Sequence, residues 1–349
     1  MVMEKGYMPL EHHYRLIKEH QSEMRWDGKE DFNEWKDRAK AKLKELLGIA
    51  EIEKFACPVE IEIEYDRYAE DLDAREISFY FTSEENVTIP CILDIPKRAE
   101  GKKLPLMIAI QGHSRGIHMG LGRSVFPGDK QDIDAMWDRD YAKIALGEGL
   151  AVLSLEQRGF GFNGGDPGKG NPRCKEVAKR AIMMGRTLIG ERVWDIGRAI
   201  DALEKNFADL VDLDKILLMG NSGGGTATAY TAVFEDRIKI AVPSCAVCDW
   251  EDSIAIMTHC ECNYVPYIAK YFDMGDIVAM AAPVHQVVVS GAEDNGFLID
   301  GAINSVAVGR LGYESLGASD SLYHVIAPGP HRFFAKESYP HIHRMLKEI

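Results

Sequence analysis

Short, continuous apolar runs separated by helical stretches constrain the fold of this chain most strongly. The apolar runs lie at residues 106–110, 151–155, 216–219, 238–242, 287–289 and 323–326. A run without polar alternation is typical of a strand that is buried on both faces, as in a parallel sheet. Helical stretches lie between the runs, at about 137–148, 178–205, 223–234, 298–312 and 333–348. Strands that alternate with helices indicate crossover units, so the sequence predicts an α/β protein with a mostly parallel central sheet flanked by helices.

The first part of the chain has a different pattern. Apolar residues recur there at helical spacing, at Trp35, Ala39, Leu43, Leu46 and Leu47, and Gly48 follows as a helix stop. From about 58 to 96, apolar and acidic residues alternate, which predicts antiparallel strands that open the sheet. We therefore expect an N-terminal helical extension at residues 1–52 and one α/β domain at 53–349.

Charge and cysteine content limit the cellular setting and the partners. The chain has 349 residues, with 55 acidic against 41 basic side chains and a net charge of −14. This balance argues against nucleic-acid partners and against docking on anionic membranes. The odd number of cysteines, seven, argues against a disulfide framework. With no apolar run of about 18 residues and no signal-peptide pattern, we expect a cytoplasmic protein, with the extension as a candidate homo-oligomer contact.

One short motif predicts a nucleophile. Gly220-Asn221-Ser222-Gly223-Gly224 lies directly after the strand run at 216–219 and directly before a helix of small residues. This strand–turn–helix setting is the one that a Gly-x-Ser-x-Gly turn requires, because the sharp bend lifts the serine hydroxyl clear of the sheet. A serine hydroxyl also needs a base to take its proton. An acid and a histidine elsewhere in the chain are therefore expected.

The acid and the base follow in the order expected for this motif. Asp294 lies at the tip of the turn after the strand 287–289, with Glu293 as the alternative acid. His331 lies on the loop after the last strand, where an imidazole could reach Ser222. The other candidates are less suitable: His324 lies within a strand, His285 just before one, and His341 and His343 on the C-terminal helix.

A second loop predicts the groups that would stabilise an oxyanion. Gln111-Gly112-His113-Ser114 follows the strand 106–110. An acyl-transfer site needs two backbone N–H groups directed at the developing negative charge. We expect one from His113 and the other from Gly223, the residue after the nucleophile.

On these residues the chain resembles the α/β-hydrolase superfamily over roughly residues 58–349. The likeness is greatest to the acetyl xylan esterase and cephalosporin-C deacetylase group and its dienelactone-hydrolase-like relatives, and includes Arg158-Gly159-Phe160-Gly161. The resemblance implies the catalytic triad Ser222, Asp294 and His331, oxyanion donors on His113 and Gly223, and a site shaped from below by the Arg158 segment. The chain departs from the group's patterns in having Gly223 where Gln is common, Gln-Gly-His in place of His-Gly-Tyr, and Ser222 where dienelactone hydrolases have Cys.

Together these features predict a serine hydrolase that cleaves a carboxylic ester, with a short acyl group on a carbohydrate or small molecule, and needs no cofactor. The expected substrate contacts are Gln111, Arg158, Trp250 and Tyr264. A serine peptidase or a thioesterase of the same fold remains an alternative. A catalytically silent or metal-binding member of the fold is a second alternative.

The metal-binding alternative depends on one group of residues: Cys245, Cys248, His259, Cys260 and Cys262. Thiolates and imidazoles are the usual zinc ligands. The first cysteine pair follows an apolar strand, however, where cysteine behaves as a small hydrophobic residue, and we predict no metal site. The Gly-x-Gly-x-x-Gly match at 159–164 does not predict a nucleotide site, because the glycine-rich residues 165–170 after it cannot begin a helix.

Overall fold

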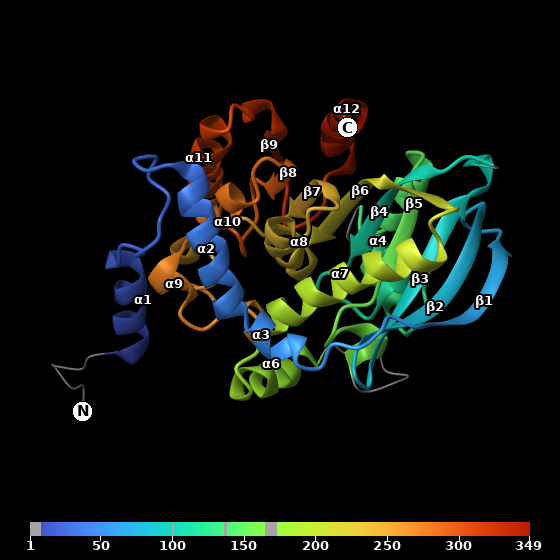
Figure 1. Ribbon diagram of the computed structural model, residues 1–349, viewed down its shortest axis with the longest axis horizontal. Coiled ribbons are helices and arrows are strands. Elements are labelled where there is room, and N and C mark those ends of the chain that lie inside the picture. Colours follow the sequence, from blue (N-terminus) through green and yellow to red (C-terminus); the bar gives the residue numbers. More distant parts are fainter. Residues whose placement is uncertain (1–7, 100, 136–137, 165–172) are drawn as a thin grey trace.

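A nine-stranded sheet forms the centre of the computed structural model, which describes residues 8–99, 101–135, 138–164 and 173–349 (Figure 1). The strands are β1 (Ile61–Ala69), β2 (Ala74–Glu84), β3 (Val87–Pro96), β4 (Leu104–Ile110), β5 (Ala151–Leu155), β6 (Val211–Asn221), β7 (Ile238–Ser244), β8 (His285–Gly291) and β9 (Leu322–Ala327). Each apolar run that predicted a buried strand lies within one of them.

The strand order is β1-β2-β3-β5-β4-β6-β7-β8-β9. β1, β2 and β3 pair antiparallel, as the alternating pattern predicted, and β3 is also antiparallel to β5. From β5 to β9 every neighbouring pair is parallel. The prediction of an α/β fold with a mostly parallel sheet is therefore confirmed.

Helices cover both faces of the sheet. They are α1 (Pro9–Glu19), α2 (Phe32–Leu47), α3 (Ile49–Glu53), α4 (Asp129–Ala135), α5 (Tyr141–Gly147), α6 (Cys174–Met183), α7 (Leu188–Asn206), α8 (Gly223–Phe234), α9 (Ile268–Tyr271), α10 (Met274–Met280), α11 (Ile299–Ser315) and α12 (Ala335–Glu348). The stretch 178–205, predicted as one helix, is split between α6 and α7. Gly185 has a φ of +71° between them, and Thr187 begins α7 by accepting a hydrogen bond from the Gly190 N–H.

Strand β4 shows why its sequence is apolar throughout. Leu106, Ile108 and Ile110 pack in a core cluster with α7, whereas Met107 and Ala109 pack on the opposite face with residues of α5 and α12. Successive side chains of a strand point to opposite faces, so a strand between two helix layers needs apolar residues at every position.

The N-terminal helices pack on the sheet domain at one end of the molecule, opposite the antiparallel strands β1–β3 (Figure 1). The stripe predicted for the extension is buried along α2 and shares one core cluster with α8 and α10. Gly48 ends α2 with a φ of +72°, the left-handed conformation expected of a helix stop.

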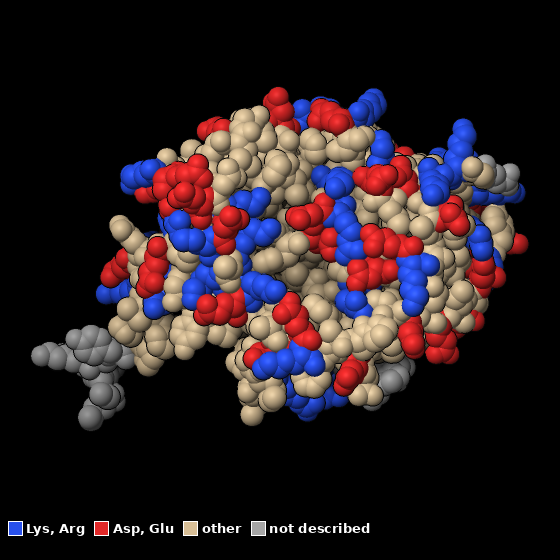
Figure 2. Space-filling model, in the orientation of Figure 1, with Lys and Arg blue, Asp and Glu red and all other residues tan. Residues whose placement is uncertain are grey.

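The surface carries both signs of charge. On the face shown in Figure 2, acidic and basic side chains are interspersed over the helices and the sheet edge. Within the described ranges, no helix combines the length and the apolar character needed to cross a bilayer. Two stretches used in the sequence analysis lie outside the described part of the chain. They are the glycine-rich residues 165–172, which follow the Gly-x-Gly-x-x-Gly match, and residue 137, where a helix was expected to begin.

Candidate active site

Ser222 occupies a strained turn between β6 and α8. Its backbone has φ 58° and ψ −123°, a conformation that a residue with a side chain rarely adopts. Such strain costs on the order of 1–3 kcal/mol and is found mainly at functional sites. The Ser222 N–H donates to the Ser244 carbonyl of β7 at 2.8 Å, which fixes the turn against the neighbouring strand. The geometry is that of the turn predicted from the sequence.

Asp294 and His331 meet at the carboxyl ends of β8 and β9. His331 Nδ1 lies 2.7 Å from Asp294 Oδ2, and Asp294 Oδ1 accepts hydrogen bonds from the Gly296 and Phe297 N–H groups. Burial opposes ionisation of Asp294, but the His331 hydrogen bond and charge, together with these N–H groups, hold the carboxyl pKa below its usual range. Glu293, the alternative acid, is exposed to solvent.

Ser222 and His331 face the same two cavities. The imidazole stacks on the Phe297 ring at 5.7 Å between centroids, with its plane tilted by 18°. No hydrogen bond joins Ser222 Oγ to His331 in this structure. Hydrogen bonds between catalytic groups are often long or poorly aligned without substrate, and they tighten when substrate binds.

The loop 111–113 packs directly against the serine turn. A Cβ atom on Gly112 would lie 2.6 Å from the Asn221 carbonyl oxygen and 2.9 Å from Ser222 Cβ, so only glycine allows this approach. Within the described residues, no group accepts a hydrogen bond from the backbone N–H of His113 or of Gly223. Gly223 is the first residue of α8, where a helix leaves its N–H groups unpaired.

A buried carboxyl that the sequence analysis missed supports this loop from behind. Glu156, directly after β5, accepts hydrogen bonds from the Gln111 side chain and, at 3.2 Å, from the Ile117 N–H. Burial raises the pKa of Glu156 to about 7 despite these hydrogen bonds. The side chain of Gln157 also donates to the Gln111 carbonyl. Glu156 lies two residues before the Arg158-Gly159-Phe160-Gly161 segment, but no periodic signal distinguishes it from an exposed loop acid.

Two cavities adjoin the serine, and both also contact His113 and His331. The first, of about 230 Å³, is lined on its far side by Asp138, Arg139, Tyr141, Arg332 and Phe333. The second, of about 420 Å³, is lined by Thr258, His259, Cys260, Asn263 and Phe297. Gln111, a predicted substrate contact, lines the first cavity. The arginines were not foreseen, because they follow no motif.

Neither cavity is lined by three of the predicted substrate contacts, Arg158, Trp250 and Tyr264. Arg158 is buried in an ion-pair network with Glu84, Glu191 and Asp195, which occupies its guanidinium. Trp250 is buried, and its indole N–H donates to the Phe272 carbonyl. The Tyr264 hydroxyl donates to the Ile254 carbonyl. Each side chain is oriented by a local partner that its place in the sequence does not reveal.

The other histidines that were considered as bases have partners elsewhere. His324 lies in β9, where its Nε2 is 3.0 Å from Ser290 Oγ and burial lowers its pKa to about 4. His341 and His343 both lie on α12. His341 stacks on Tyr323, and His343 Nε2 lies 2.7 Å from Glu148 Oε2. His285 is the first residue of β8, and burial lowers its pKa.

The cysteines do not form the group considered in the sequence. The Cys245 thiol donates to the Arg332 carbonyl, Cys248 lies near the Asp252 and Leu298 carbonyls, and His259 contacts the Gly296 carbonyl. Cys260 and Cys262 instead meet Cys174 and His113, and the four possible ligand atoms lie within 4.8 Å of one another. The Cys174 and Cys260 thiols lower the pKa of Cys262, and the nearby Arg192 guanidinium lowers it further.

Comparison with known proteins bears on the fold. No family model matches the sequence. The chain is 26% identical over 226 residues to the "Putative hydrolase YtaP" of Bacillus subtilis, an alignment covering 60% of this chain and 71% of that protein. A crystal structure described as a "putative acetyl xylan esterase" from Bacteroides fragilis superposes with a TM-score of 0.72 at 16% identity, over 97% of this chain and 86% of the other.

A glucuronoyl esterase from Solibacter usitatus is also similar, with a TM-score of 0.65 at 17% identity, over 91% of this chain and 93% of the other. At these identities the likeness concerns the backbone. It agrees with the resemblance noted from the sequence. The protein has the α/β-hydrolase fold.

Proposed function

We propose that the protein is a serine hydrolase that cleaves carboxylic esters. The observation that carries the proposal is the position of Ser222: its strained turn places it at the junction of two cavities that His331 also lines, and His331 is bonded to the buried Asp294. A nucleophile, a base and a group that orients the base are the minimum that acyl transfer through serine requires.

In the first half of the reaction, Ser222 Oγ attacks the ester carbonyl carbon and its proton passes to His331 Nε2. Asp294 holds the opposite ring nitrogen and stabilises the imidazolium. The N–H groups of His113 and Gly223, which have no partner among the described residues, donate to the oxyanion of the tetrahedral intermediate. The C–O bond to the alcohol then breaks, and His331 returns the proton to the leaving oxygen.

In the second half, water attacks the acyl-serine carbonyl while His331 takes one of its protons. Collapse of the second tetrahedral intermediate breaks the bond to Ser222 Oγ, which regains the proton from His331. The carboxylic acid leaves, and the enzyme returns to its starting state without a cofactor.

The cavities favour a small ester. The first cavity, at about 230 Å³, is smaller than the roughly 300–1,000 Å³ typical of drug-sized ligands, so we assign it to a short acyl group. The second cavity is larger, and its lining includes the polar side chains of Thr258 and Asn263, so we assign it to the alcohol, such as a carbohydrate. The names of the structurally similar esterases are consistent with a carbohydrate ester, which is the substrate class we propose.

Labelling with a fluorophosphonate, followed by intact-mass measurement, tests the nucleophile. We expect one adduct on the native protein and on Ser315→Ala, since Ser315 is exposed on α11, and none on Ser222→Ala. A native protein that forms no adduct would refute the proposal. Rates on acetylated sugars, aryl esters, lactones, thioesters and peptides would then separate the ester substrates from the peptidase and thioesterase alternatives.

A further inference from the structure

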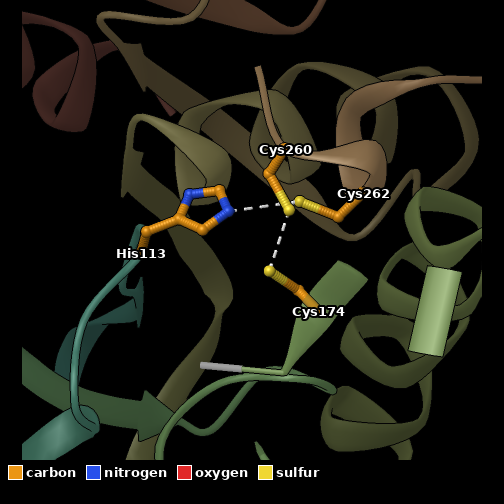
Figure 3. A group of neighbouring side chains, drawn as sticks. All are labelled: His113, Cys174, Cys260 and Cys262. Atoms are coloured by element: carbon orange, nitrogen blue, oxygen red, sulfur yellow. Dashed lines mark hydrogen bonds between the residues drawn. The ribbon is translucent and has the colours of Figure 1, made fainter. Parts of the chain in front are cut away.

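Four side chains from three separate segments converge beside the loop 111–113 (Figure 3). His113 comes from the loop after β4, and Cys174 is the first residue of α6. Cys260 and Cys262 flank the start of a short 3-10 helix, η5 (Glu261–Asn263). Their ligand atoms point toward one another, so three thiols and an imidazole surround one point in space.

One of the two distances known within this group matches a tetrahedral zinc site, and the other is shorter. With Zn–S bonds of about 2.3 Å and Zn–N bonds of about 2.0–2.1 Å, a tetrahedron places nitrogen and sulfur about 3.5 Å apart and two sulfurs about 3.8 Å apart. His113 Nε2 lies 3.4 Å from Cys262 Sγ, close to that edge. The Cys174 and Cys260 sulfurs are 2.9 Å apart, closer than a zinc edge but well beyond the roughly 2.05 Å of a disulfide.

The charge around the group also suits a bound cation. A zinc ion with three thiolates and a neutral imidazole carries a net charge of about −1. The Arg192 guanidinium lies near Cys262 and is almost fully buried, at 1% exposure. Its Nη2 donates to the Arg158 carbonyl, and its guanidinium carbon lies 4.2 Å from the centre of the Phe160 ring, but within the described residues it forms no ion pair with a carboxylate. A buried cation without a carboxylate is costly, and an anionic metal centre would balance it.

The segments that supply the thiols are already held together. Lys175 and Lys179 on α6 both pair with Glu261, which lies between Cys260 and Cys262. Cys174 and Cys262 are buried, while Cys260 and His113 are half-buried. Four protein ligands leave no open position, which is typical of a structural rather than a catalytic zinc site.

We propose that His113, Cys174, Cys260 and Cys262 bind a structural zinc ion. The ion ties the loop 111–113 to α6 and η5 through the His113 imidazole, and the backbone N–H of the same residue is the proposed oxyanion donor. It therefore holds that donor in place beside the cavity that Cys260 and Ser222 both line. Three soft thiolates with one imidazole favour zinc over the hard cations, which prefer oxygen ligands.

Metal analysis of the purified protein tests this proposal without depending on catalysis. We expect about one zinc per chain in the native protein, and less than about a fifth of that in Cys262→Ser and Cys174→Ser, because each loses one of four ligands. Cys57→Ser is the matched control, since Cys57 is half-buried like Cys260 but lies outside the group. It should keep the full zinc content.

Two further measurements keep the proposal testable if a variant fails to fold. Native apoprotein, prepared with a chelator, should take up Co²⁺ and show the sulfur-to-cobalt charge-transfer and d–d absorption of a tetrahedral thiolate site. Denatured, chelator-treated protein should titrate all seven thiols. No zinc and no cobalt spectrum would overturn the proposal, and so would five titrating thiols, which would indicate a Cys174–Cys260 disulfide.

Discussion

Two groups of residues meet at the loop 111–113. In the first, Ser222, Asp294 and His331 come from the ends of β6, β8 and β9, whose order the sheet fixes. In the second, His113 meets Cys174, Cys260 and Cys262, which come from a helix start and a short turn. The first group could be predicted because strand ends of a parallel sheet gather at one edge. The second depends on how long connections pack, which no periodicity encodes.

Removing the base should have the largest effect on activity. His331→Ala leaves Ser222 without a group to take its proton, and we expect kcat for a short-chain p-nitrophenyl ester to fall by about 10⁴–10⁶. His324→Ala is the matched control, because His324 is bonded to Ser290 within the sheet and lines neither cavity. It should retain nearly full kcat. The reverse pattern would show that the base was assigned wrongly.

The same contrast explains how far the sequence could lead. The apolar runs and the Gly-x-Ser-x-Gly turn were sufficient to predict the sheet and the serine turn. The three predicted substrate contacts that line neither cavity, Arg158, Trp250 and Tyr264, lie outside the regular pattern. The partners that orient them, such as Asp195 at 2.7 Å from Arg158, are determined by tertiary packing. The substrate cavities and the cysteine group could not be predicted for the same reason.

An intermediate effect is expected where the loop touches the serine turn. Gly112→Ala would place a Cβ atom 2.6 Å from the Asn221 carbonyl, so the loop must move away and carry the His113 N–H with it. Loss of one oxyanion donor typically costs about 10²–10³ in kcat, and we expect a fall of that size with KM changed much less.

Gly147→Ala provides the control for this substitution. Gly147 ends α5 with nothing within 4 Å of an added Cβ, so the variant should keep the native kcat and be at least as stable. Equal activity of Gly112→Ala and Gly147→Ala would show that the loop does not supply a donor. If the zinc content of Gly112→Ala is unchanged, the contact with the serine turn can be perturbed without disturbing the proposed zinc ligands.

The smallest expected effect concerns the buried Glu156 carboxyl, which accepts hydrogen bonds from the Gln111 side chain and the Ile117 N–H. The pKa of Glu156 is about 7 in the folded protein, against about 4.5 for an ordinary glutamate, so the folded state binds more protons between these values. The free energy of unfolding should therefore fall by up to about 3 kcal/mol as the pH rises from below 4.5 to above 7, and level off beyond it. Urea unfolding across this range should show a shallower pH dependence in Glu156→Gln than in the native protein. In Glu85→Gln, where the glutamate is exposed, the native dependence should persist. Identical slopes in all three proteins would mean that the pKa of Glu156 is the same in the folded and unfolded states, and that burial does not raise it.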